Sequence, residues 1–404
     1  EGHKWVLFPS AALAWRISDE PFMKDLLWLD NLKLRVGYGK TGNSAVSPYQ
    51  TKGQLALRHY VFNNGSSEYI GYAPSVMAND QLTWETTDQW NVGVDFGFLK
   101  NRINGTVEFY LQNTKDLLLK RQLPVVSGFS SVMSNVGSTR NKGVEITLNT
   151  RNIMNRNFTW STDLTFSANK EEIVELYNGK TDDVGNLWFI GQPIDVYYNY
   201  KKIGIWQNTE NDLAEMAKFN EKGANFKPGS IRLEDVDGDY KITEEDKQIL
   251  GSVRPKFVAS MVNNFEFKGF DLSVFLYASV GGLLRNNIEF MEKPGRGNTV
   301  KVDYWTPTNP TNAFPRPSVD VEKLDYISTL GYDKADFLRI RNITLGYTLP
   351  EMWSKKVLMD KIRIYLSANN PAIFTNFTGI DPEGANGRTA PSYSTWMFGI
   401  NLSM

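Results

Sequence analysis

Residues 89–98, Gln-Trp-Asn-Val-Gly-Val-Asp-Phe-Gly-Phe, alternate between large apolar side chains and polar or small ones. A four-residue link follows at 99–102, and residues 103–112, Ile-Asn-Gly-Thr-Val-Glu-Phe-Tyr-Leu-Gln, alternate again. Because successive side chains of a β-strand point to opposite faces, the two runs predict a hairpin with one apolar face. Each run has the length of about ten residues that a tilted strand needs to cross a bilayer. Strands of soluble proteins are usually about half as long.

The same alternation recurs along the chain and predicts eleven crossings of a membrane. Aromatic residues recur on the apolar phase near the ends of the runs, as an interfacial girdle requires. Residues 195–206 also read as a strand, but a crossing there would break the alternating direction of its neighbours. We therefore expect them to form an extended strand or hairpin outside the membrane. The eleven predicted crossings are 8–17, 31–40, 88–98, 103–113, 140–150, 158–169, 256–267, 270–279, 337–348, 361–370 and 394–404.

The connections between these runs alternate between short and long. A β-sandwich has turns of comparable length at both ends, whereas outer-membrane barrels keep short turns in the periplasm and long loops outside. The short links fall at 18–30, 99–102, 151–157, 268–269 and 350–360, the first with a turn of helix at 21–29. The long ones, expected to be extracellular, fall at 41–84, 116–136, 170–255, 280–335 and 371–393.

Composition narrows the classes of function. The chain has 404 residues, no cysteine, two histidines and a formal charge of −1. A disulfide framework, a thiol nucleophile and a Cys-ligated metal are excluded, and a partner chosen by bulk charge, such as nucleic acid, is disfavoured. No nucleophile–base constellation stands out, so we expect no enzyme. No apolar run is long enough for a membrane-spanning helix.

Five stretches resemble the SusC/RagA class of TonB-linked outer-membrane transporters, and together they cover the chain in order. The resemblance implies a barrel of about twenty-two strands that is filled by an N-terminal plug. Eleven crossings fit the C-terminal half of such a barrel, so we expect 1–404 to be that part, with the plug outside this chain. The stretches are Phe-Pro-Ser-Ala-Ala-Leu-Ala-Trp-Arg-Ile-Ser (8–18), Leu-Lys-Leu-Arg-Val-Gly-Tyr-Gly-Lys-Thr-Gly-Asn (32–43), Ser-Thr-Arg-Asn-Lys-Gly-Val-Glu (138–145), Gly-Gln-Pro-Ile (191–194) and Phe-Leu-Arg-Ile-Arg-Asn-Ile-Thr-Leu-Gly-Tyr-Thr-Leu-Pro (337–350).

The resemblance also implies a function. Such transporters import glycan oligomers or peptides, are driven by the TonB complex and work under a SusD-like surface lipoprotein lid. A passive porin and, less favoured, a secreted β-rich glycan-binding protein are the alternatives. Two features depart from the family pattern: the chain ends on Met404, not on an aromatic residue, and the apolar phase slips within 337–348. A bulge near Arg341 and Asn342 would explain the slip.

The stretch 235–246, Asp-Val-Asp-Gly-Asp-Tyr-Lys-Ile-Thr-Glu-Glu-Asp, spaces its carboxylates like a calcium loop. Side chains of Asp235, Asp237, Asp239 and Asp246 and the carbonyl of Lys241 are the expected ligands of a structural Ca²⁺ ion. Two residues depart from the pattern, because Tyr240 stands where Gly is favoured and Asp246 where a bidentate Glu is usual. An Asp-rich turn without a metal is the alternative.

Loop aromatics are candidates for substrate binding. Trp188, Tyr304 and Trp305 could stack on sugar rings, or they could pack the loops against one another. For any single one of them, packing is the favoured interpretation.

Overall fold

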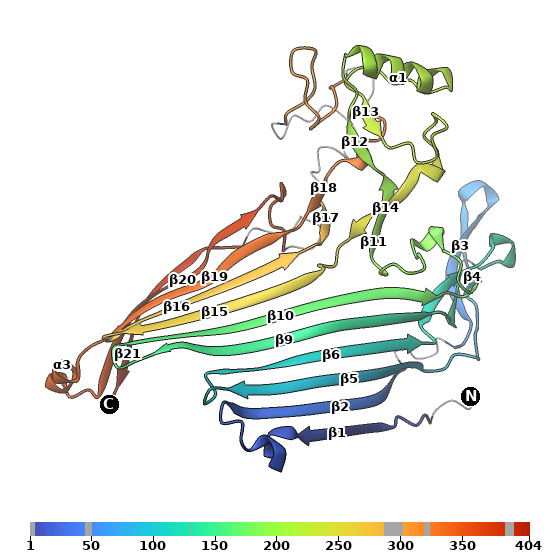
Figure 1. Ribbon diagram of the computed structural model, residues 1–404. Helices are drawn as coiled ribbons and strands as arrows, with labels where there is room; N and C mark the ends of the chain where they lie inside the picture. The colour runs from blue at the N-terminus through green and yellow to red at the C-terminus, as the bar shows by residue number, and fades with distance from the viewer. Residues whose placement is uncertain (1–4, 45–50, 130, 287–301, 319–323, 384–391) are drawn as a thin grey trace. The chain divides into compact units, whose positions relative to one another are not determined.

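The computed structural model describes residues 5–44, 51–129, 131–286, 302–318, 324–383 and 392–404. Its main feature is an eleven-stranded antiparallel sheet whose strand order follows the chain (Figure 1). All eleven predicted crossings coincide with these strands, so the prediction of the fold class is confirmed. The strands are β1 (Ser10–Arg16), β2 (Leu29–Asn43), β5 (Glu85–Phe98), β6 (Ile103–Lys115), β9 (Ser138–Met154), β10 (Phe158–Glu175), β15 (Phe257–Phe267), β16 (Phe270–Val280), β19 (Phe337–Thr348), β20 (Lys361–Thr375) and β21 (Thr395–Ser403).

The chain divides into two compact units, each with part of this sheet. The first comprises residues 1–155 with 159–194 and holds β1 to β10. Its register aligns the predicted apolar phase across strands, since Leu34 pairs with Val94, Val94 with Val107 and Val107 with Ile146. A side chain one residue away from this row points to the opposite face. One face of this unit is therefore apolar and the other polar, as the alternation predicts.

The second unit comprises residues 156–158 with 195–404 and repeats this arrangement. Leu272 pairs with Leu345, Leu345 with Leu366 and Leu366 with Phe398, which forms an apolar row across four strands. The predicted bulge in β19 is confirmed, because the register skips Arg341 against both β16 and β20. This extra residue returns the apolar side chains on its two sides to one face.

The links at one end of the strands are short and contain the few turns of helix there. The sequence predicted one helical turn over 21–29, but the structure has only the 3₁₀ turn η2 (Pro21–Met23) in that range, so the predicted turn was too long. A second 3₁₀ turn, η1 (Ile17–Asp19), precedes it. A short helix α3 (Glu351–Ser354) and a 3₁₀ turn η8 (Lys355–Val357) join β19 to β20. Among the described residues, no helix has the length and apolar character needed to cross a membrane.

The long connections carry structure of their own, apart from the large sheet. Residues 45–50, 130, 287–301, 319–323 and 384–391 of these predicted loops lie outside the described residues. Residues 195–206 lie outside the large sheet, as expected, since their two strands pair with strands of small separate sheets. Their position outside the membrane stays a prediction. The pairs are β3 (Gln54–Phe62) with β4 (Ser67–Val76), β7 (Leu118–Gln122) with β8 (Ser131–Asn135), β11 (Val196–Tyr200) with β14 (Lys247–Ser252), β12 (Lys202–Ile205) with β13 (Ile231–Leu233), and β17 (Leu283–Arg285) with β18 (Tyr332–Lys334). The remaining elements are α1 (Glu210–Glu221) and the 3₁₀ turns η3 (Asn63–Gly65), η4 (Val125–Ser127), η5 (Val184–Asn186), η6 (Glu244–Asp246) and η7 (Ile327–Thr329).

Candidate ion-binding loop and the module that carries it

Residues 195–255, 302–318 and 324–335 of the second unit form what we call the loop module. Its core consists of side chains from both long connections, and they are all less than a tenth exposed. Ile242, inside the acidic stretch, packs against this core and gives that stretch an apolar underside. The core residues are Ile205, Ile231, Leu233, Trp305 and Leu330.

The side chain of Lys202 joins the two long connections inside the module by hydrogen bonds. Lys202 donates hydrogen bonds from Nζ to the carbonyl oxygens of Asn312 and Ala313, both at 2.7 Å. Burial lowers the pKa of Lys202, because the ammonium group has lost part of its water shell. Strand β12 and the bend at 312–313, about a hundred residues apart in sequence, thus share one hydrogen-bonded centre.

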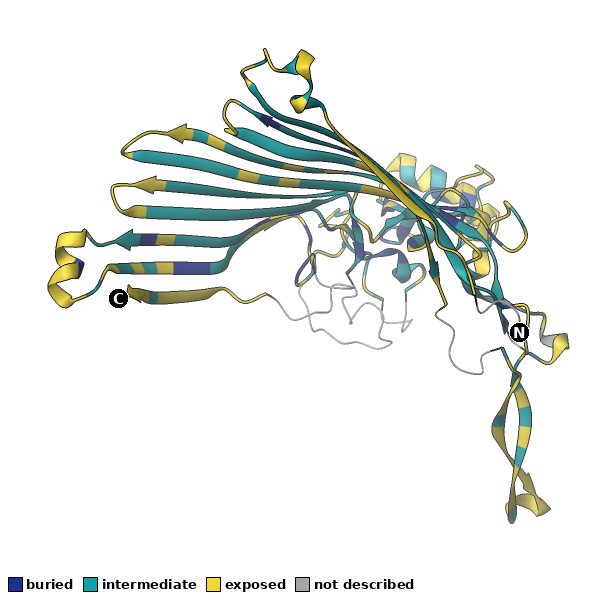
Figure 2. Cartoon of the chain, turned by 90° about the horizontal axis from the view of Figure 1, so that it is seen from below, coloured by how far each residue is buried: buried dark blue, intermediate teal, exposed yellow. Residues whose placement is uncertain are grey.

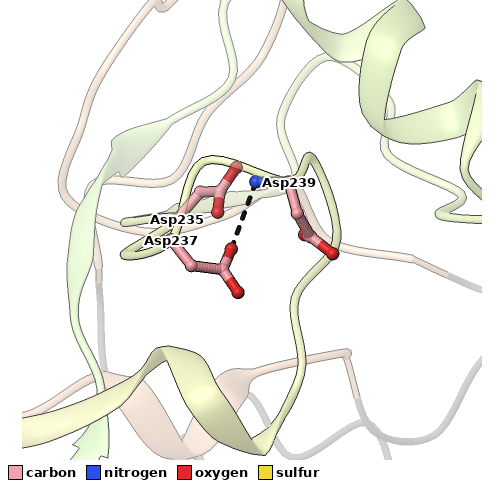
Figure 3. A group of neighbouring side chains, drawn as sticks. All are labelled: Asp235, Asp237 and Asp239. Carbon is pink, nitrogen blue, oxygen red and sulfur yellow. Dashed lines mark hydrogen bonds between the residues drawn. The ribbon is translucent and has the colours of Figure 1, made fainter.

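The acidic stretch folds into a tight loop in which three carboxylates converge (Figure 3). One oxygen from each of Asp235, Asp237 and Asp239 lies within 4.8 Å of the others. Backbone amides hold these groups in place: Gly238 and Tyr240 donate to Asp235 at 2.9 Å, and Asp239 donates to Asp237 at 3.1 Å. Three neighbouring carboxylates repel one another, and a divalent cation with oxygen ligands would relieve that repulsion. The donor set therefore fits Ca²⁺.

Tyr240 illustrates how the loop accommodates its departure from the usual pattern. Its φ is 62°, the left-handed region in which glycine is favoured. In that conformation its ring packs edge-on against Phe219 of α1, with centroids 5.4 Å apart, and lies under the ammonium of Lys218. Ring packing thus offsets the unfavourable backbone conformation.

Asp246 has a different role from the one predicted. Its side chain is 1% exposed, and its oxygens accept hydrogen bonds from the amides of Val236 (2.8 Å) and Thr243 (2.7 Å). It is not in the converging group, which among the described residues consists of the other three aspartates. The structure therefore assigns Asp246 to bracing the loop and capping η6, and the Lys241 carbonyl stays a prediction.

The three loop aromatics lie in different environments. Trp305 is 5% exposed and donates from Nε1 to the Gln207 side-chain oxygen at 2.8 Å. It packs the loops together, which is the interpretation that the sequence favoured. Tyr304 is 45% exposed and remains accessible. Trp188, in the first unit, is half-buried beside η5.

Two charged clusters on the polar faces of the sheet have no counterpart among the predicted site residues. In the first unit, Arg35 donates two hydrogen bonds to Asp95, both at 3.0 Å, and lies 3.7 Å from Glu108. The alternation of the strands does place all three on one face, so a signal existed. In the second unit, Arg339 is buried and lies 2.7 Å from Asp381, which comes from the β20–β21 connection. No local pattern links residues 42 positions apart.

Asp381 is held in its ionised form by this cluster. Burial alone raises the pKa of Asp381, but hydrogen bonds from Ser392 and the Glu383 amide, together with Arg339, bring it below its usual value. The described ends of the last long connection are thereby fastened to the polar face of β19.

Comparison with known proteins then identifies the family. A family model described as "TonB dependent receptor-like, beta-barrel" matches residues 2–371. The chain belongs to the TonB-dependent receptor family. Proteins of this barrel family lie in the outer membrane, so the apolar rows of the sheet face lipid and the predicted localisation is confirmed.

Among the members of the TonB-dependent receptor family, the chain is similar to proteins of the SusC/RagA type. It is 32% identical to TonB-dependent receptor P3 of Formosa agariphila, an alignment that covers 100% of the chain and 42% of the relative. It is also 32% identical to TonB-dependent receptor SusC of Bacteroides thetaiotaomicron, over 99% of the chain and 40% of the relative. The RagAB peptide transporter superposes with a TM-score of 0.77 at 25% identity, over 98% of the chain and 43% of that structure. The chain thus spans about two fifths of these proteins.

Proposed function

We propose that this chain is part of the wall of an active importer of oligomeric nutrients, glycan oligosaccharides or peptides. The observation that carries the proposal is the two-faced sheet: apolar rows suit lipid, and the opposite face holds charged clusters that suit a water-filled or plug-filled interior. SusC and the RagAB peptide transporter, to which the chain is similar, support this type of transport. A transport role requires no catalytic residue.

The orientation and the partners belong to the same proposal. Short links lie in the periplasm and long connections outside, as in other outer-membrane barrels. The loop module then stands at the outer rim, where a SusD-like lipoprotein would form a lid. The rest of the barrel and the plug come from parts of the protein beyond 1–404, and the plug receives energy through the TonB complex.

Uptake with and without TonB distinguishes import from passive diffusion. Cells that express the full-length protein are supplied with fluorescent oligosaccharides and peptides of graded length. Active import predicts that uptake of one class stops when TonB is deleted. Unchanged uptake in the deletion strain would instead establish the passive porin.

We further propose that the acidic loop holds a structural Ca²⁺ ion through Asp235, Asp237 and Asp239. The ion supplies positive charge that the three carboxylates share, and the loop's apolar underside then stays packed on the module core. Without the ion we expect the loop to loosen while the membrane strands remain unchanged.

Limited proteolysis of the full-length protein tests the ion. Wild-type protein should become sensitive between 207 and 255 when a chelator is added, and Asp237→Ala with Asp239→Ala should be sensitive without it. Glu210→Ala with Glu221→Ala is the matched control, because it removes two exposed charges from the same module. Equal protection of every sample would show an acidic turn that needs no metal.

A further inference from the structure

The short links of the sheet expose large apolar side chains at an end that has no loop module to bury them. In the first unit Leu27 is 89% exposed, and Trp28 and Leu99 are about half exposed. In the second unit Leu358 is 88% exposed and Met352 is 67% exposed. Apolar groups that gather in exposed turns usually mark a surface that is covered in the working protein.

Backbone conformation makes two of these residues more unusual. Leu99 has φ 56° and Leu358 has φ 58°, in the left-handed region that glycine and asparagine adopt most readily. Each leucine occupies a turn whose backbone favours a smaller polar residue, and each directs an apolar side chain outward. Strain retained for an exposed apolar group indicates an interaction outside the chain.

Cations accompany the apolar groups at the other short links, whereas the link 18–30, which carries Leu27 and Trp28, is acidic, with Asp19, Glu20, Asp25 and Asp30 against Lys24. The links 99–102, 155–157 and 268–269 contain Lys100, Arg102, Arg156 and Lys268 and no acidic residue. In the link between β19 and β20, Lys355 pairs with Glu351, and Lys356 follows it. Each of these links thus joins positive charge to exposed apolar side chains within the link or at the strand ends beside it.

The exposed groups continue the lipid-facing rows. The ring of Trp28 packs against Phe98, the last residue of β5, with centroids 5.7 Å apart. At the corresponding end of the second unit, Phe270 packs against Tyr347 at 4.5 Å. Both contacts lie at the strand ends beside the short links, where a membrane barrel carries its interfacial girdle of aromatic residues.

We propose that the short links bind the headgroup layer of the adjoining leaflet and prefer anionic phospholipid. Apolar side chains would enter the upper acyl region, while lysine and arginine would meet the phosphates. The same chemistry recurs at links of both units and is continuous with the lipid-facing rows, which favours a lipid surface over a single docked protein. The proposal rests on the membrane wall and on neither the substrate nor the TonB coupling.

A site-specific fluorescent label measures this contact. The chain has no cysteine, so Met352→Cys in α3 introduces a single thiol into it for a bimane label. The full-length protein, with any cysteine outside this chain replaced, is reconstituted in phosphatidylcholine vesicles with an equal fraction of brominated phosphatidylcholine or brominated phosphatidylglycerol. We expect both lipids to quench the label, and phosphatidylglycerol to quench it more strongly.

Charge variants test whether the preference for phosphatidylglycerol comes from the lysines of the links. Lys355→Gln with Lys356→Gln should reduce the selectivity for phosphatidylglycerol by about fivefold per lysine removed. Lys180→Gln with Lys222→Gln, two exposed lysines in long connections, should leave it unchanged. Leu358→Asn tests the apolar contribution: asparagine suits the left-handed backbone, so weaker quenching by both lipids cannot come from a misfolded turn.

Two results would overturn the proposal. Absence of quenching by either lipid would place the links in water, available to a periplasmic protein or a second copy. Equal quenching by the two lipids would leave an apolar contact with no preference for anionic headgroups.

Discussion

The wall of strands and the loop module bury opposite kinds of residue. In the wall, Leu34, Val94 and Val107 lie on the apolar face, while Arg35 and Asp95 pair on the other. Along the wall strands most residues are intermediate or exposed, as the teal and yellow ribbons of Figure 2 show. In the module, Trp305 and Ile205 are buried, and the carboxylates of the acidic loop are at the surface. The apolar side chains of the wall face lipid, whereas the charged side chains of the module face water.

The two regions also differ in how far apart in sequence their contacts are. Wall strands pair mostly with the strand that follows across a link, so hydrogen bonds of the sheet fix most of its geometry. The module depends on contacts such as Gln207 with Trp305, 98 residues apart. We therefore expect damage in one region to leave the other folded.

The largest effect is expected from Trp305→Ala in the module. Loss of this buried ring should cost roughly 3–5 kcal/mol and leave the Gln207 oxygen without its donor. Hydrogen exchange should rise over 195–255 while the wall strands stay protected. Tyr304→Ala, next in sequence but 45% exposed, is the control. Reduced substrate binding with normal protection would restore the sugar-stacking interpretation.

The next effect probes the wall. Val107→Arg places a charge on the lipid face and should cost about 2–4 kcal/mol near the bilayer midplane. Thr106→Arg, which points to the polar face beside Asp95, should cost much less. Gly93 is unsuitable as a control, because a Cβ there would lie 2.8 Å from the Arg35 guanidinium. Urea unfolding in vesicles measures the difference, and equal costs would contradict the assignment of the faces.

A smaller effect is expected at the start of α1. The Thr209 hydroxyl accepts a hydrogen bond from the Asp212 amide and caps the helix. Thr209→Ala should therefore destabilise the module by about 1 kcal/mol, and Thr209→Asp should restore the cap. Proteolysis within 207–222 should follow this order, while heat resistance of the wall should not change.

The smallest effect is a pH dependence confined to the module. Hydrogen bonds from Lys201 and Gln248 lower the pKa of Glu234. A carboxylate whose folded pKa is lowered contributes stability above its unfolded pKa and loses that contribution as pH falls through the folded value. Because Glu234 is over a third exposed, we expect about 0.5 kcal/mol or less. Glu234→Gln should destabilise the module at pH 7, and its difference from wild type should disappear as the pH falls through the lowered folded pKa, below the usual glutamate range; an equal difference at neutral and acidic pH would disprove the linkage.

Most of the wall was predictable because its signal is local. Period-two alternation located all eleven strands, and the phase slip located the bulge at Arg341. The module was not predictable in the same way. The burial of Trp305 and the pairing of Arg339 with Asp381 depend on segments that meet only in the fold. The acidic loop lies between these cases: its spacing predicted three converging aspartates but not the bracing role of Asp246.

The extra residue in β19 changes which sequence positions carry the lipid-facing side chains, from even-numbered residues before Arg341 to odd-numbered residues after it. If Arg341 instead paired in regular register, the outer part of the strand would shift by one position, so that Arg339 would face lipid and Leu338 the interior. Deletion of Arg341 would only remove the bulge and keep both side chains on their present faces. The same extra residue separates the strand into two stretches whose phases are set independently. Sequence changes beyond it, toward the connection that holds Asp381, can therefore accumulate without altering the lipid-facing pattern of residues 342–348.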